Sequence, residues 1–191
     1  MNRYQCLKKQ QFLLDNYELV PIRKEDIQKI KDWRNAQIEI LRQEKPITEG
    51  EQIDYYNNVL KKIFYQKNPE QVLFSFLLQG KCIGYGGLVH INWNLKKGEI
   101  SFLLDDKRIG NLEQYQMEFD IFLRLITDIA FNELKFNQIF TETFDIRPKH
   151  ILTLEKFGFK FEKRNKEHIL INGKYVDSLM HSFGRENHAK K

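Results

Sequence analysis

Residues 138–159, with the sequence QIFTETFDIRPKHILTLEKFGF, contain the clearest signals for the fold. Residues 138–144 predict a strand, and residues 148–157 predict a helix that Gly158 closes in the position of a C-terminal cap. A further strand is predicted over residues 160–171. A strand, a helix and a strand in this order form a crossover, which predicts a mixed sheet covered by helices.

The rest of the chain supplies more strands and helices around this unit. Ile27, Ile30 and Trp33 recur at three-residue steps and predict a helix over residues 24–35. Thr48 and Glu51 form a capping box ahead of a second helix, which is expected to run to about residue 65. A third helix is predicted over residues 117–134. The remaining predicted strands cover residues 17–22, 72–78, 81–91, 98–105 and 175–183. The fold class is therefore α/β.

The size and composition predict one domain. The chain has 191 residues, of which 41% are hydrophobic and 30% are charged. We expect an N-terminal extension over residues 1–16, the domain over residues 17–184 and a C-terminal tail over residues 185–191. No apolar run is long enough to span a bilayer and the first residues lack the features of a secretory signal, so we predict a cytoplasmic protein without a membrane partner.

The charge and the cysteines exclude some classes of function. The net charge is +5, but 31 basic residues are interleaved with 26 acidic ones and no nucleic-acid-binding signature is present. Nucleic acid is therefore an improbable main partner, and the positive charge suits an anionic small ligand equally well. Cys6 and Cys82 show no metal or redox spacing, and we predict no metal site.

Several motifs together resemble the GNAT family of N-acetyltransferases, in the branch that acts on ribosomal proteins and amino sugars. The ending LEKFGF at residues 154–159 is the most specific of them. The others are WRN at residues 33–35 with LR at 41–42, GYGGL at 84–88 and GEISF at 98–102. They occur in the order of that family, and the likeness covers about residues 17–183.

This resemblance implies a mainly antiparallel central sheet with helices on both faces and with splayed fourth and fifth strands, here residues 98–105 and 138–144. Unpaired backbone groups between these strands would bind the pantetheine arm of acetyl-CoA, in the manner of an added strand. A primary amine then attacks the thioester directly. The cofactor-binding residues expected on this basis are Phe102, Leu103, Leu104, Lys107, Arg108, Gly110 and Arg147.

Two positions depart from the family pattern. The pyrophosphate-binding loop, DDKRIGNL at residues 105–112, has one glycine where the family has two small residues, and the helix after it is expected to begin only after residue 116. Lys107 and Arg108 could replace the missing backbone contacts, or the loop is a solvated turn. Leu154 replaces a tyrosine that many relatives use as the general acid. His150 could take that role, or it packs at the start of its helix.

The remaining candidates concern the acceptor amine. Glu99 is the candidate general base, with an exposed strand glutamate as the alternative. Trp33, Arg34, Arg42 and Tyr85 are expected to shape the acceptor pocket, although Trp33 equally fits the apolar face of its helix. The resemblance favours a nucleotide-linked amino sugar as acceptor, followed by a protein N-terminus, and is compatible with a homodimer. The alternatives are a catalytically inactive GNAT-like binding module and, more weakly, an RNA-associated protein.

Overall fold

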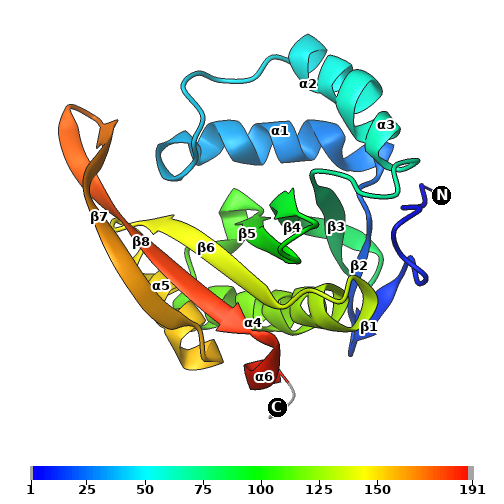
Figure 1. Ribbon diagram of the computed structural model, residues 1–191. Helices are drawn as coiled ribbons and strands as arrows, with labels where there is room; N and C mark the ends of the chain where they lie inside the picture. Colours follow the sequence, from blue (N-terminus) through cyan, green and yellow to red (C-terminus); the bar gives the residue numbers. More distant parts are fainter. Residues whose placement is uncertain (1, 189–191) are drawn as a thin grey trace.

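A computed structural model describes residues 2–188, which form one eight-stranded sheet in the order β1-β2-β3-β4-β5-β6-β8-β7 (Figure 1). Neighbouring strands are antiparallel except β5 and β6, which are parallel. This arrangement confirms the mixed, mainly antiparallel sheet expected from the sequence. The strands are β1 Phe12–Leu14, β2 Tyr17–Pro21, β3 Val72–Leu78, β4 Lys81–Asn92, β5 Lys97–Leu104, β6 Gln138–Phe144, β7 Lys160–Ile171 and β8 Lys174–Gly184.

Helices cover both faces of the sheet, as expected. The first three lie on one face, whereas α4 and α5 lie on the other (Figure 1). π-helical turns join α2 to α3 and extend α4. Within residues 2–188, no helix is long and apolar enough to cross a membrane. The helices are α1 Ile27–Ala36, α2 Glu49–Tyr55, α3 Lys61–Ile63, α4 Leu112–Asp128, α5 Pro148–Phe157 and α6 Arg185–His188.

Residues ahead of Tyr17 are packed against the sheet. The short strand β1 pairs with β2. Tyr4 is buried, and its hydroxyl both donates to the carbonyl of Leu73 and accepts from the N–H of Leu73, at 2.9 and 2.8 Å. Two hydrogen bonds to the backbone of one buried residue fix this segment to β3.

The helix boundaries around the crossover are set by their caps. α5 ends where Gly158 adopts a left-handed φ of 104°, as its position in the sequence predicts. The predicted start of the third long helix after residue 116 is wrong, because α4 begins at Leu112. Asn111 caps it, with its side-chain oxygen accepting from the N–H of Gln114 at 3.0 Å.

The central feature of the sheet is the divergence of β5 and β6. They pair over only three positions, from Lys97 opposite Gln138 to Glu99 opposite Phe140. β5 then continues to Leu104 and β6 to Phe144, and within residues 2–188 the two strands do not pair with each other again. The expected splay is therefore confirmed, and it leaves backbone hydrogen-bonding groups of both strands facing a gap.

The glycines of the GYGGL motif let β4 fit between β3 and β5. A β-carbon at Gly86 would overlap the carbonyl oxygen of Ser101 and the ring of Phe122. The oxygen belongs to the backbone of the neighbouring strand and cannot turn aside. The motif therefore places β5 close to β4 and to the aromatic core beneath it.

We predict that Gly86→Ala lowers the free energy of unfolding by about 3 kcal/mol, because the added methyl group overpacks the centre of the sheet. The matched control is Gly50→Ala on α2, where a β-carbon would meet no atom within 4 Å. That substitution should raise stability by up to about 1 kcal/mol. Urea unfolding of both variants checks this, and equal effects would contradict the close approach of β4 and β5.

Candidate functional site

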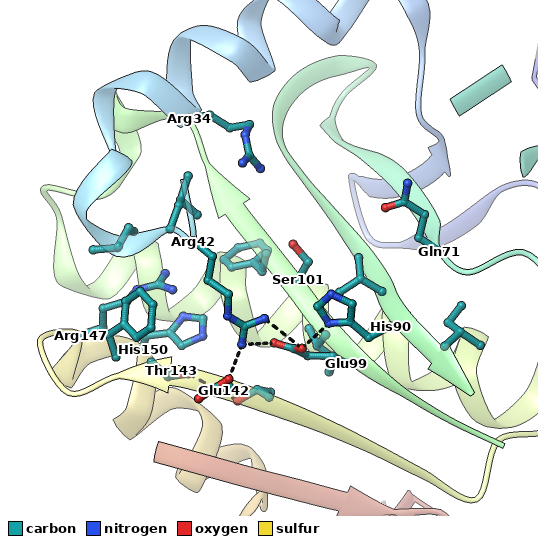
Figure 2. A pocket seen from close by; sticks show the side chains of 18 of the residues that line it. Arg34, Arg42, Gln71, His90, Glu99, Ser101, Glu142, Thr143, Arg147 and His150 are labelled. Carbon is teal, nitrogen blue, oxygen red and sulfur yellow. Dashed lines mark hydrogen bonds and ion pairs between the residues drawn. The ribbon is translucent and has the colours of Figure 1, made fainter. Parts of the chain in front are cut away.

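The splay opens into a cavity of about 710 Å³ that passes between β5 and β6, from the side of α1 to the side of α5 (Figure 2). β4, β5, β6, the segment after α1 and the start of α5 contribute its walls. Six residues singled out from the sequence line it: Arg34, Arg42, Glu99, Phe102, Arg147 and His150. The two strands that border the cavity are those predicted over residues 98–105 and 138–144.

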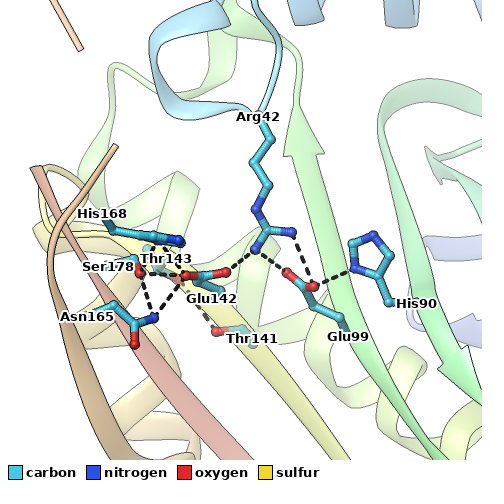
Figure 3. A network of polar contacts seen from close by, with 9 residues as sticks. All are labelled: Arg42, His90, Glu99, Thr141, Glu142, Thr143, Asn165, His168 and Ser178. Carbon is cyan, nitrogen blue, oxygen red and sulfur yellow. Dashed lines mark hydrogen bonds and ion pairs between the residues drawn. The ribbon is translucent and has the colours of Figure 1, made fainter. Parts of the chain in front are cut away.

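Two carboxylates face each other across the gap and share one guanidinium group (Figure 3). Glu99 on β5 accepts from both terminal nitrogens of Arg42, at 2.9 and 3.3 Å. Glu142 on β6 accepts from Nη2 of Arg42 at 2.6 Å. Because Glu99 and Glu142 are largely buried, with side-chain exposures of 10% and 13%, Arg42 balances charge that water screens poorly.

Further polar groups hold the outer sides of the two carboxylates. His90 lies with Nδ1 2.8 Å from Oε2 of Glu99. Oε1 of Glu142 accepts from the hydroxyl of Ser178 at 2.5 Å and lies 2.9 Å from Nδ1 of His168. Burial works against ionisation of Glu142, but the hydrogen bond from Ser178 and the charge of Arg42 keep its pKa below the ordinary value.

The opposite side of the cavity is built around His150. Its ring stacks on Phe119, with centroids 4.2 Å apart, and its Nδ1 lies 2.8 Å from the hydroxyl of Tyr115. Arg147 donates to the same hydroxyl at 3.4 Å. Burial, followed by the charge of Arg147 and the neighbouring His181, lowers the pKa of His150 well below 6.5. His150 is therefore neutral at pH 7.

Arg108 and Glu118 form a pair outside the cavity. The side chain of Glu118 is fully buried on α4, and Nε of Arg108 donates to both of its oxygens, at 3.1 and 2.9 Å. Nη2 of Arg108 contacts Glu118 as well. The charge of Arg108 is thus already compensated within the fold. Lys107 and Gly110 lie exposed in the same turn ahead of α4.

The other residues predicted from the sequence do not line the cavity. Trp33 is buried in the core, on the inner face of α1. The hydroxyl of Tyr85 accepts from Arg34 at 2.6 Å. Leu103 and Leu104 are buried on β5, and the carbonyl of Leu104 accepts from the side chain of Gln37 at 2.8 Å.

Two polar side chains of the cavity, Glu142 and His90, were not among the site residues predicted from the sequence. Glu142 is recognised only when β6 is placed beside β5, and His90 only when the β-bulge between β4 and β5 brings its ring to Glu99. Tyr115 was missed for a related reason, since the predicted helix began after it. Its position within α4 follows from the cap at Asn111.

The splay has the features that an extended acyl-CoA arm requires. The unpaired backbone groups of β5 and β6 offer donors and acceptors to an added strand-like ligand. A second hollow of about 250 Å³, lined partly by Ile109, Ile146, Arg147 and Lys149, adjoins the cavity at His150. Apolar walls and two cations suit the arm and the phosphates of such a ligand. Among residues 2–188, no group of three potential metal ligands occurs.

The lowered pKa of His150 predicts a pH-dependent stability. The unfolded chain binds a proton near pH 6.5 whereas the folded chain does not, so stability falls as the pH drops below about 6.5 and is complete above it. The free energy of unfolding should depend less steeply on pH in His150→Asn than in the wild type, by up to about 1.4 kcal/mol per pH unit between about pH 5 and 7. Urea unfolding across this range measures the slope, and identical slopes would contradict the buried neutral state.

Comparisons with known proteins agree with this geometry. A family model described as an acetyltransferase (GNAT) domain matches residues 19–180. No curated protein sequence matches the chain. The spermidine N-acetyltransferase from Vibrio cholerae, solved with CoA and spermine, is 18% identical with a TM-score of 0.81, covering 92% of this chain and 99% of that one.

Two further solved structures share the fold. A chimeric form of the Vibrio cholerae spermidine N-acetyltransferase is 18% identical with a TM-score of 0.79, covering 93% of this chain and 100% of that one. A structure described as a putative acetyltransferase is 15% identical with a TM-score of 0.70, over 95% of this chain and 90% of that one. At these identities the solved structures establish the fold, whereas the family match spans most of the sequence. The chain belongs to the GNAT acetyltransferase family and is an acyl-CoA-dependent N-acetyltransferase that uses acetyl-CoA.

Proposed function

We propose that this enzyme acetylates a primary amine on an acceptor that carries positive charge, such as a polyamine. The observation that carries the proposal is the pair of carboxylates, Glu99 and Glu142, facing each other across the cavity with a guanidinium group between them. A site that holds the cation of Arg42 between two glutamates also suits an ammonium group of the acceptor. The polyamine ligand of the Vibrio cholerae structure supports this choice.

The balance of charge on the α1 side supports a cationic acceptor. Glu70, Glu99 and Glu142 line the cavity together with Arg34 and Arg42, and a third guanidinium group, that of Arg147, lies beside Tyr115 and His150. Both arginines are already engaged, Arg42 by the glutamates and Arg34 by hydrogen bonds within the protein. An anionic acceptor such as a nucleotide-linked amino sugar would instead require free cations at this place. The branch of the family suggested by the sequence remains a prediction.

Acetyl-CoA supplies the thioester that the amine attacks, and the protein positions the two reactants. Backbone N–H groups in the splay are suited to stabilising negative charge that develops on the carbonyl oxygen. The opposite side of the cavity can supply a proton. Because Arg147 donates to the oxygen of Tyr115, the phenolic hydrogen is free to point to Nδ1 of His150, which places the imidazole hydrogen on Nε2.

We therefore propose that Tyr115 and His150 together take the role of the tyrosine that Leu154 replaces. A proton passes from Nε2 of His150 to the departing CoA thiolate while Nδ1 receives the phenolic proton, and Arg147 stabilises the phenolate that remains. Burial raises the pKa of Tyr115, so the phenol is fully protonated at neutral pH. Arg147, expected from the sequence to bind the cofactor, would support this pair in addition.

The test is an acceptor panel that contains spermidine, a peptide with a free N-terminus and a nucleotide-linked amino sugar. Release of the CoA thiol measures acetylation. We expect the highest kcat/KM with spermidine, and we expect Glu142→Gln to raise its KM about 10-fold, because one charged hydrogen bond to the ammonium is weakened. Glu113→Gln on the exposed first turn of α4 is the control for a lost surface charge.

The other outcomes separate the remaining candidates. A higher kcat/KM with the amino sugar, or an unchanged KM for spermidine in Glu142→Gln, would contradict the cationic acceptor. A preference for the peptide would identify a protein N-terminus as the acceptor. Binding of acetyl-CoA without acetylation of any amine would instead favour the catalytically inactive binding module.

A further inference from the structure

His90 occupies an irregular position near the C-terminal end of β4. Val89 pairs with Glu99 and Asn92 pairs with Lys97, so two residues of β4 stand opposite Gly98 alone. This β-bulge gives His90 a φ of 48°, in the left-handed region that residues other than glycine adopt rarely. Such a conformation within a strand often accompanies a functional position, so the surroundings of the ring are informative.

The bulge changes the direction of the His90 side chain. In a regular strand Val89, the cross-strand partner of Glu99, would share its face of the sheet, and residue 90 would point to the opposite face. The bulge instead turns the imidazole toward Glu99, with Nδ1 2.8 Å from Oε2 (Figure 3). The ring lines the cavity and 65% of its side chain is exposed, compared with 10% for Glu99.

The contacts of Glu99 determine which nitrogen of His90 carries the proton. Glu99 forms an ion pair with Arg42, and a carboxylate can only accept hydrogen bonds. Nδ1 of His90 must therefore be the donor, and the neutral ring has its lone pair on Nε2. Because Nε2 lies across the ring from Nδ1, it points away from Glu99 and is available to the acceptor or to a bridging water.

We propose that His90 and Glu99 act as a pair that removes the proton from the acceptor amine, with Nε2 of His90 as the proton acceptor. This inference rests on the proposed acetylation of an amine. An N–H bond of the ammonium breaks and leaves its electron pair on the nitrogen, while a new N–H bond forms at Nε2. The amine is then nucleophilic, Glu99 stabilises the imidazolium, and the proton passes from Nε2 to solvent.

Other groups around His90 are less suited to this role. Arg42 cannot give up its proton at neutral pH. Both oxygens of Glu142 are engaged, one by Arg42 and the other by Ser178. The charged side chains that line the cavity with His90 are Glu70, Glu99 and Glu142, which favour the imidazolium, and Arg34, Arg42 and Arg147, which oppose it.

The discriminating variant is His90→Asn. Asparagine tolerates the left-handed conformation and keeps an N–H donor for Glu99, but it cannot accept a proton. We expect kcat/KM for spermidine to fall about 100-fold. The part of the decline in activity on acidification that protonation of His90 causes should be absent. Imidazole added to His90→Gly, which also fits this backbone, should restore activity in proportion to the concentration of neutral imidazole.

The matched control is His168→Asn, which removes the corresponding histidine from the outer side of Glu142. It should alter KM and leave the acidic limb of the pH profile in place. An unchanged profile in His90→Asn, with activity within about 3-fold of wild type, would overturn the role of His90 while the proposed function stands. A wild-type enzyme that acetylates no amine would overturn both.

Discussion

The separation of β5 and β6 after three paired residues is the constraint on which the rest of the structure depends. A buried peptide group without a hydrogen-bond partner costs about 1–3 kcal/mol, so a gap within a sheet must be held open by other contacts. β6 is tied along its whole length to β8. β5 is fixed by its pairing with β4 and by Phe102, which stacks on Phe119 of α4 with ring centroids 4.5 Å apart. Side chains from the α1 side satisfy some of the unpaired backbone groups, since the side chain of Gln37 donates a hydrogen bond to the carbonyl of Leu104.

The two faces of the gap differ in chemistry because side chains alternate along each strand. Glu99 and Glu142 point to the α1 side, where Arg42 joins them, whereas Phe102 points to α4 on the other side. A single passage through the sheet therefore has a charged end suited to an amine and an end at His150 and Tyr115 suited to the thioester. The opposite ends allow two reactants to approach one carbonyl carbon from different directions.

Local patterns in the sequence predicted the fold well because they arise from neighbouring residues. The cap at Gly158, the capping box at Thr48 and the three-residue spacing of the apolar residues in α1 need no knowledge of distant contacts. The resemblance to the family then predicted the separation of the two strands and the candidate residues Glu99 and Arg42. The start of α4 was missed because Asn111 was not recognised as a cap.

The remaining site residues depend on tertiary structure. Glu142 gains its meaning from the register between β5 and β6, and His90 gains it from a bulge that breaks the alternation of β4. The partner of Arg108 is Glu118, a residue ten positions away that is fully buried only because α4 packs beneath the sheet. Composition and periodicity contain none of these relationships.

The most direct test of this account is amide hydrogen exchange with and without acetyl-CoA. If the splay is the binding site, the unpaired amides of residues 100–104 and 141–144 should exchange more slowly when acetyl-CoA is bound, because its extended arm supplies their missing partners. Amides in β1 and β2, at the far edge of the sheet, should be unaffected. Protection that appears elsewhere, or binding that leaves both segments unprotected, would contradict the central place given to the gap between β5 and β6.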